Sequence, residues 1–140
     1  MVDTEGFLLA VVVHAADVND REGADWVLRR AAYHWPTLEL AWADQGYTGA
    51  ALADAVHQQY HLRLDIVRHR DGQQGFEVLP RRWVVERTHA WLGRSRRLSK
   101  EYEHWPDNTE TVIYLASLHQ LLQRLAPDPT RPTPYADRAA

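Results

Sequence analysis

The first half of the chain alternates short apolar runs with stretches of helical periodicity, and this alternation limits its possible folds. Three runs are typical of buried strands because they are continuous, apolar and rich in β-branched residues. Two helix-like segments separate them, so the predicted order is strand, helix, strand, helix, strand over residues 6–14, 19–34, 38–43, 50–60 and 62–68. Alternation at this spacing favours an α/β layered sheet with some parallel pairing.

Turn and capping residues mark the ends of these segments. Residues 3–6 (DTEG) predict a hairpin turn before the first strand, although only two residues precede that turn. Asn19 and Glu22 have the spacing of a capping box at the start of the first helix. Pro36 follows the end of this helix, and helices usually stop before a proline.

A longer helix is predicted from Pro80 to about Leu98, and its two sides differ in character. One side gathers apolar residues that we expect to pack on the sheet, namely Val84, Val85, Trp91, Leu92 and Leu98. The other side presents the carboxylate of Glu86 among Arg82, His89, Gly93, Arg97 and Lys100. We therefore expect this second side to combine a single acid with a basic surface.

A last helix is predicted over residues 108–125, with Asp107 and Glu110 as its capping box. Its apolar stripe consists of Val112, Leu115, Leu118, Leu122 and Leu125. Four prolines follow, which predict a disordered tail over residues 127–140. Since 140 residues suit one domain, we expect a single domain over residues 1–126.

The composition limits the kind of site that the chain can carry. There is no cysteine, so disulfides and thiolate metal sites are excluded, and any metal must bind oxygen or imidazole. The eight histidines have neither HExxH nor paired zinc spacing, so no zinc site is predicted. The longest apolar run has only strand length and no signal peptide opens the chain, so we expect a cytoplasmic protein.

Positive charge is concentrated in one stretch of a chain whose net charge is −3. Residues 66–100 contain nine Lys and Arg against three acids, and eight of the nine are arginines. Arginine forks match the oxygens of phosphate groups, so the stretch favours a polyanion as partner. A solvated helix face, or pairing with the acids of residues 1–65, explains the same pattern and stays open.

Two carboxylates have positions that suit a metal-dependent site. Asp44 follows a buried strand and opens a turn with two glycines, and ligands of open α/β sheets bind at such strand ends. Glu86 is the only acid between Arg81 and Lys100. Carboxylates of this kind can hold two Mg²⁺ ions, which activate a water and stabilise a leaving oxygen. The structural alternatives are that Asp44 is an ordinary turn residue and that Glu86 forms an ion pair with Arg82. Sequence spacing alone does not show whether the two acids lie close together.

Two further residues have a possible functional interpretation. His89 shares the helix face of Glu86, so it either orients a phosphate or moves a proton, or it is an ordinary surface histidine. Tyr47, in the turn after Asp44, is placed to stack on a base.

Three segments resemble the DDE transposases of bacterial insertion sequences, in the group whose catalytic domain has an RNase H-like fold. They are VDTEGFLLAVVVHAADVNDREGA, WADQGYTG and LPRRWVVERTHAWLGRSRRLSKEYE, and the resemblance runs from about Val2 to Leu125. It implies that Asp44 is the second catalytic aspartate and that Glu86 is the catalytic glutamate. The family's arginine four residues before the glutamate corresponds to Arg82.

The sequence departs from this family at two places. Some relatives have a tyrosine and a lysine where this chain has Leu79 and Gly93, and Arg94 or Arg97 is placed to supply the missing charge. The family's first catalytic aspartate lies on a strand upstream of the DTEG turn. We therefore expect an RNase H-like mixed sheet flanked by helices and truncated at the N-terminus, without its first strand and most of its second.

The resemblance implies a transposase that cuts and joins DNA with Mg²⁺ or Mn²⁺ held by Asp44 and Glu86. Without the first aspartate, we expect this chain to be inactive alone. The alternatives are a non-catalytic DNA-binding fragment that occupies element ends or inhibits full-length transposase, and a chain that does not fold stably. Expected partners are double-stranded DNA, at element ends and targets, and this chain itself or full-length transposase, with no membrane. The predicted DNA-binding residues are Arg81, Arg82, Arg87, His89, Arg94, Arg96, Arg97 and Lys100.

Overall fold

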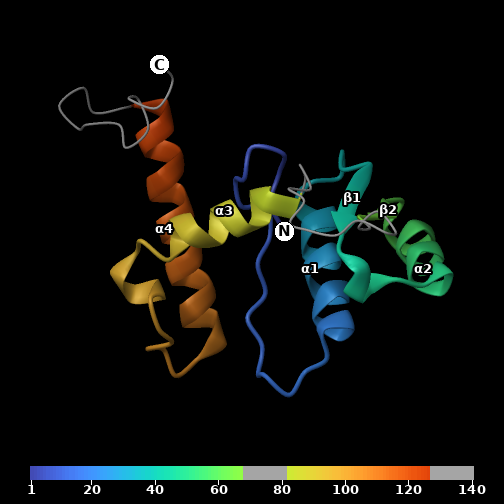
Figure 1. Ribbon diagram of the computed structural model, residues 1–140, viewed down its shortest axis with the longest axis horizontal. Helices are drawn as coiled ribbons and strands as arrows, with labels where there is room; N and C mark the ends of the chain where they lie inside the picture. The colour runs from blue at the N-terminus through green and yellow to red at the C-terminus, as the bar shows by residue number, and fades with distance from the viewer. Residues whose placement is uncertain (68–81, 127–140) are drawn as a thin grey trace, which may run out of the picture.

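Two short parallel strands and four α-helices make up the computed structural model, which describes residues 1–67 and 82–126. The elements are α1 (Asp20–His34), β1 (Leu40–Ala43), the 3₁₀ turn η1 (Gln45–Tyr47), α2 (Ala50–Tyr60), β2 (Arg63–Ile66), α3 (Arg82–Leu92), the 3₁₀ turn η2 (Arg96–Leu98) and α4 (Pro106–Leu125). Figure 1 shows α1, α2 and the strands on one side of the view, and α3 and α4 on the other. Helices combined with a parallel strand pair are consistent with the predicted α/β class. The larger RNase H-like sheet stays a prediction.

The core of the first half lies between the strands and the two helices that flank them. Leu28 of α1, Ala41 of β1, Val56 of α2 and Leu62 before β2 form a buried cluster. Partly buried apolar side chains pack around this cluster, namely Met1, Leu38, Leu52, Tyr60 and Leu64. Burial of these residues therefore holds the strand pair against α1 and α2.

The two strands run parallel, with α2 as the crossover connection between them. Their register is Leu40↔Arg63, Ala41↔Leu64, Trp42↔Asp65 and Ala43↔Ile66. Both strands are shorter than predicted but lie inside the predicted segments. Parallel pairing brings the carboxyl ends of β1 and β2 to one edge, which is where Asp44 follows β1.

The predictions for the first two helices are confirmed. Asn19 is the N-cap of α1, but its side chain accepts a hydrogen bond from the amide of Arg21 at 2.9 Å rather than from that of Glu22, so the predicted capping box is not formed. The helix ends at His34, two residues before Pro36. The second helix, α2, ends where His61 adopts a left-handed conformation with φ 54°. Local capping residues thus set these helix ends.

The predicted strand over residues 6–14 is wrong. The DTEG turn before it forms, since the amide of Asp3 donates to the carbonyl of Phe7 at 2.9 Å and Gly6 has φ 86°. Beyond the turn, one isolated antiparallel bridge, Val2↔Leu8, is the only strand pairing of this segment within the described residues. A strand needs a series of hydrogen bonds to a neighbouring strand, and the two residues before the turn are too few to form more than this single bridge.

Side chains bond the backbone of residues 9–13 in place of a neighbouring strand. The Trp35 indole donates to the carbonyl of Leu9 at 3.1 Å, and the Arg30 guanidinium donates to the carbonyl of Val11. The amide of Val13 donates to Glu110 Oε1 at 2.9 Å. Because backbone polar groups require partners, this segment bonds Met1 at residues 9 and 10 and the side chains of Trp35, Arg30 and Glu110 along the rest of its length.

The ends of α3 and α4 differ from the predictions. The helix predicted to reach Leu98 ends at Leu92, where the amide of Gly93 still donates to the carbonyl of His89, and η2 follows separately. The predicted capping box of α4 is wrong, because α4 begins at Pro106 and its N-cap, Trp105, makes no side-chain cap bond. The other predicted capping residue, Glu110, instead binds α1 and the 9–13 segment.

The leucines predicted as the apolar stripe of α4 are exposed. Leu115, Leu118, Leu122 and Leu125 have exposed fractions of 60%, 50%, 53% and 72%. None of the described helices is long and apolar enough to cross a membrane. The predicted loop after β2, the start of the helix at Pro80, and the tail over 127–140 lie outside the described residues.

Candidate metal ligands and nucleic-acid interface

Asp44 lies at the carboxyl edge of the strand pair, directly after β1, and is exposed. It is the N-cap of η1, and its Oδ1 accepts a hydrogen bond from the amide of Gly46 at 3.0 Å. Asp44 is therefore both a turn residue and a carboxylate at the end of a strand, which were the two interpretations of its sequence position. The hydrogen bond directs Oδ1 of this carboxylate toward the turn, at the edge where ligands of α/β sheets bind. Tyr47, the predicted base-stacking residue, lies in the same turn and is half-buried.

Glu86 lies near the middle of α3 and is exposed. The ion pair predicted as its structural alternative involves the side chain of Arg82, which is outside the described part of the chain. Carboxylate oxygens are the ligands that Mg²⁺ prefers, so the chemistry of Asp44 and Glu86 suits this ion. Over residues 1–67 and 82–126, however, no three His, Cys, Asp or Glu side chains are close enough together to hold a metal. The described residues therefore do not form a complete metal site.

Thr88 fixes which side of α3 faces the protein. Its side chain is 2% exposed, and Oγ1 is within hydrogen-bonding distance of two carbonyls, that of Gly6 at 2.9 Å and that of Val84 at 3.0 Å. A Cβ at Gly6 would lie 2.9 Å from this oxygen, so the close approach requires glycine. The predicted apolar side is correspondingly shifted, because Val85 is 45% exposed. Contact with the DTEG turn therefore sets the rotation of α3.

Arg87 is held between two tryptophans of its own helix. Its guanidinium lies 4.1 Å from the ring centroid of Trp83 and 4.7 Å from that of Trp91, and it donates to the carbonyl of Glu5 at 2.9 Å. The guanidinium of Arg124 from α4 also lies over Trp91, at 4.8 Å. These stacked cations and rings join α3 to α4 and to the DTEG turn. The predicted DNA-binding residue Arg87 is thus already engaged within the fold.

The remaining predicted DNA-binding residues are concentrated around the end of α3 and η2. Arg94, Arg96 and Lys100 are exposed, and none of them makes an ion pair within the described residues. Arg97 pairs with Glu103, and His89 is exposed on α3. Arg81 and the side chain of Arg82 lie outside the described part.

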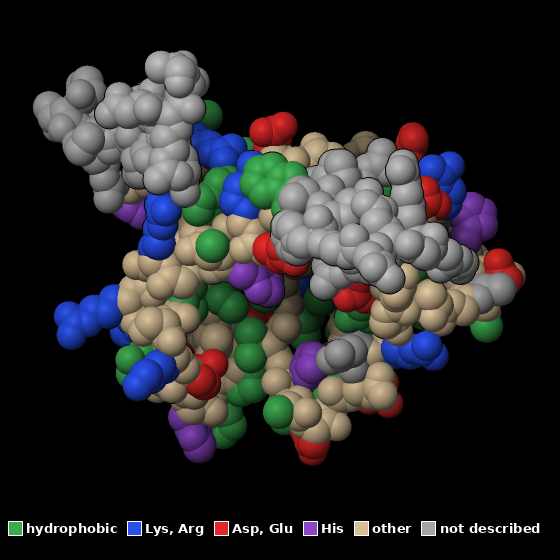
Figure 2. Space-filling model, viewed as in Figure 1, with side chains coloured by type: hydrophobic (Ala, Val, Ile, Leu, Met, Phe, Trp, Pro, Cys, Tyr) green, Lys and Arg blue, Asp and Glu red, His purple; other side chains and the backbone are tan. Residues whose placement is uncertain are grey.

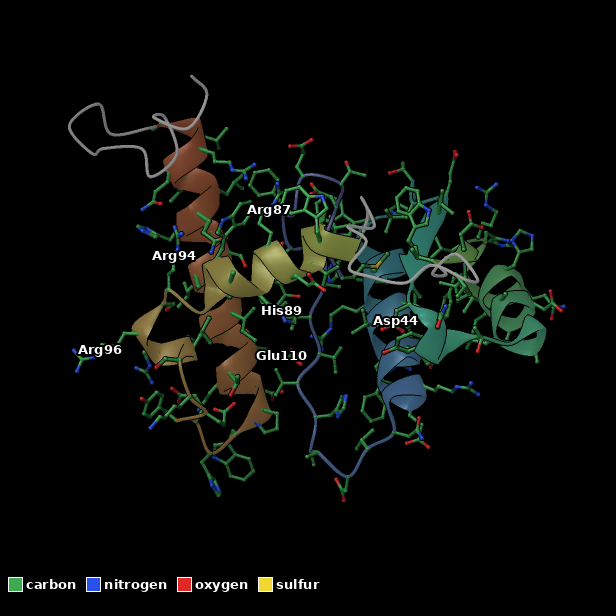
Figure 3. All side chains as sticks on the ribbon, in the orientation of Figure 1. Asp44, Arg87, His89, Arg94, Arg96 and Glu110 are labelled. Atoms are coloured by element: carbon green, nitrogen blue, oxygen red, sulfur yellow. The ribbon has the colours of Figure 1, made fainter. Side chains whose placement is uncertain are left out.

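Figure 3 places the labelled residues Arg87, His89 and Arg94 along α3, with Arg96 beyond its end and Asp44 beside β1. Lys and Arg side chains also project from the α4 side of the molecule in Figure 2. Arg97 is paired with Glu103, whereas Arg94 makes no ion pair within the described residues.

An ion pair that no sequence pattern predicted connects α1 to α4. Arg30 binds Glu110 at 2.5 Å, and the two side chains are 36% and 12% exposed. This hydrogen bond raises the pKa of the Arg30 guanidinium above its ordinary value. The two residues are 80 positions apart in the chain, so no local pattern relates them.

A family model described as "Transposase DDE domain" matches residues 1–121. The chain belongs to the transposase DDE-domain family. The resemblance to DDE transposases is thereby confirmed, and membership of this family indicates an enzyme of the nuclease and transposase type that acts on DNA. Searches of curated proteins and of solved structures found no match.

Proposed function

We propose that this transposase DDE domain takes part in DNA transposition, cutting and joining the DNA of a bacterial insertion sequence. The family match over residues 1–121 carries the proposal. The position of Asp44 after a parallel strand supports it, since ligands of α/β sheets bind at that edge. The proposal includes an RNase H-like fold and action in the cytoplasm.

In this proposal, Asp44 and Glu86 are the carboxylates that this chain contributes to a Mg²⁺ or Mn²⁺ site. Such ions, when bound, activate the attacking hydroxyl and stabilise the leaving oxygen. Asp44 contributes a carboxylate that the Gly46 amide already orients. Glu86 contributes a carboxylate from a helix whose rotation Thr88 fixes. Preorganisation of this kind lowers the cost of holding ligands in place.

We assign binding of the DNA backbone to the exposed cations around the end of α3. Arg94, Arg96 and Lys100 have no ion-pair partner within the described residues, so phosphate oxygens do not have to displace one. His89 is exposed on the same helix and is assigned to a phosphate. Arg81, Arg82 and Arg97 belong to the same proposed interface, whereas Arg87 positions α3.

A non-catalytic DNA-binding fragment is the second candidate function. It is favoured by the contrast between the free cations and the lack of a three-residue metal group in the described part of the chain. Under either proposal, we expect little strand transfer by this chain alone, because the described residues include no group of three metal-binding side chains.

Fluorescence anisotropy with a duplex oligonucleotide tests the DNA interface. The triple variant Arg94→Gln, Arg96→Gln, Lys100→Gln should weaken binding and lower the slope of log affinity against log salt by about 2–3. The matched control is Arg63→Gln, which removes an exposed arginine of β2 that already pairs with Asp65. Equal affinities for the triple variant and the control would refute the assigned interface.

Nicking of supercoiled plasmid, with and without Mg²⁺, separates the two candidate functions. Weak Mg²⁺-dependent nicking that is lost in Asp44→Asn supports the transposase chemistry. DNA binding without nicking supports the non-catalytic fragment. Nicking that survives Asp44→Asn contradicts the assignment of Asp44 as a metal ligand.

A further inference from the structure

The turn that follows β1 is bonded to the first turn of α1. The Arg21 guanidinium donates a hydrogen bond from Nη2 to the carbonyl of Thr48 at 3.1 Å. These residues are 27 positions apart in the chain, and Thr48 comes directly after η1. Figure 1 shows this turn beside the lower end of α1. A long-range contact therefore reaches the segment that begins with Asp44.

Arg21 is in place for this contact because of the way α1 begins. The side chain of Asn19 caps the helix by accepting a hydrogen bond from the Arg21 amide at 2.9 Å. Arg21 is thereby the second residue of α1, and its side chain leaves the helix from the first turn. Arg21 is exposed and makes no ion pair within residues 1–67 and 82–126. No acid in this part of the chain therefore competes with the Thr48 carbonyl for its guanidinium.

Inside the turn, a short series of hydrogen bonds connects Thr48 back to Asp44. The amide of Thr48 donates to the carbonyl of Gln45 at 3.2 Å. The amide of Tyr47 donates to the carbonyl of Asp44 at 3.2 Å, and the amide of Gly46 donates to the Asp44 carboxylate at 3.0 Å. A Cβ at Gly46 would lie 3.1 Å from Asp44 Oδ1, so the carboxylate packs closely on this residue. A movement of Thr48 thus reaches the carboxylate across only four residues.

The residue that follows the turn adds little restraint of its own. Gly49 has φ 141°, a conformation that side-chain-bearing residues rarely adopt, and it precedes α2 without a side-chain cap bond. Glycine restricts the backbone less than any other residue. The hydrogen bond from Arg21 to the carbonyl of Thr48 therefore limits the motion of a segment that its own sequence leaves adaptable.

We propose that Arg21 is a positioning residue for Asp44. By holding the carbonyl of Thr48, Arg21 keeps the turn in one conformation and the Asp44 carboxylate at the carboxyl edge of the strand pair. This inference rests on the proposed function, in which Asp44 is a metal ligand. A ligand that is held in place before the metal binds costs less to order when the metal arrives.

Amide hydrogen exchange, measured by NMR on the complete chain without metal, tests the effect of Arg21 on the turn. In Arg21→Ala, the amide of Gly46 should exchange about fivefold faster, because the turn loses one exposed hydrogen bond. Arg21→Lys keeps a charged donor and should recover part of the protection. The amide of Val67, which is bonded to β1 at the same edge, should exchange as in the wild type. The control is Arg29→Ala, which removes another exposed arginine of α1 and should leave Gly46 protected.

Mn²⁺ affinity, measured by electron paramagnetic resonance with duplex DNA present, tests the effect of Arg21 on the metal. Arg21→Ala should bind Mn²⁺ about fivefold more weakly than Arg29→Ala, and Arg21→Lys should lie between the two. Partial recovery in the lysine variant shows that the donor, and not the length of the side chain alone, positions the turn.

Three results would overturn the inference. The first is an unchanged exchange rate of Gly46 in Arg21→Ala. The second is an equal acceleration at Val67, since Arg21 would then stabilise the whole fold and not the turn. The third is faster exchange of Gly46 with unchanged Mn²⁺ affinity. A wild type that binds no Mn²⁺ would instead refute the metal site itself, so failure of the proposed function is seen in the wild type and failure of this inference in Arg21→Ala.

Discussion

The partly buried carboxylate of Glu110 is predicted to be a main stabilising contact between the two halves of the molecule. It accepts a hydrogen bond from the amide of Val13 at 2.9 Å and pairs with Arg30, and its side chain is 12% exposed. In Glu110→Ala, the amide of Val13 loses its partner, which costs about 1–3 kcal/mol. The ion pair adds at most about 1 kcal/mol, since Arg30 is partly exposed and solvent screens it.

We therefore expect Glu110→Ala to lower the free energy of unfolding by about 1–4 kcal/mol. For a domain of this size, that loss corresponds to a decrease in Tm of roughly 10 °C. Glu110→Gln keeps an acceptor for the amide of Val13 and removes only the charge, so its effect should be under about 1 kcal/mol.

Thermal and urea denaturation followed by circular dichroism measure these differences. Asp65→Ala is the control, because it removes an exposed carboxylate whose pair with Arg63 spans 3.2 Å. That variant should change stability by less than about 0.5 kcal/mol. If Glu110→Ala were no less stable than Asp65→Ala, the proposed contact between α1, α4 and the 9–13 segment would not stabilise the fold.

Three further predictions concern other contacts. Gly6→Ala should lower stability by about 1–3 kcal/mol, because a Cβ there meets Thr88 Oγ1 and φ is 86°; unchanged urea midpoints would contradict this. Arg87→Lys should lower the Tm and leave duplex affinity unchanged, since Arg87 stacks on Trp83 and Trp91; a loss of affinity at unchanged Tm would place Arg87 in the DNA interface instead. Burial and the hydrogen bond to Asp25 raise the pKa of Tyr60 from 10.0 to about 12. The folded state then holds this proton more tightly, so stability should fall as pH rises from 10 to 12, and Tyr60→Phe should reduce that loss in urea titrations.

Local patterns predicted the elements whose ends depend on neighbouring residues. Asn19 is the N-cap of α1, as predicted, and the DTEG turn forms because Asp3 Oδ1 accepts hydrogen bonds from the amides of Glu5 and Phe7. The position of Asp44 after β1 was predictable for the same reason. Each of these features depends on residues only a few positions apart.

Long-range contacts decided the features that the sequence did not predict. The apolar run Phe7–Val13 has the composition of a strand. Its backbone nevertheless forms hydrogen bonds with side chains of α1 and α4 in place of a full set of bonds to a neighbouring strand. Glu110 has the spacing of a capping-box residue, yet its carboxylate binds Arg30, which lies 80 residues away in the sequence. Whether Asp44 and Glu86 share a metal ion depends on long-range packing as well, so their spacing in the sequence does not predict it.

Mn²⁺ binding measured by electron paramagnetic resonance tests most directly whether Asp44 and Glu86 hold a shared metal. We predict that the complete chain, with duplex DNA present, binds Mn²⁺, and that Asp44→Asn and Glu86→Gln each weaken this binding at least tenfold. Both variants should keep the wild-type circular dichroism spectrum, while the control Asp65→Asn binds Mn²⁺ normally. Equal Mn²⁺ affinity in the wild type and in both site variants would contradict the proposed metal site.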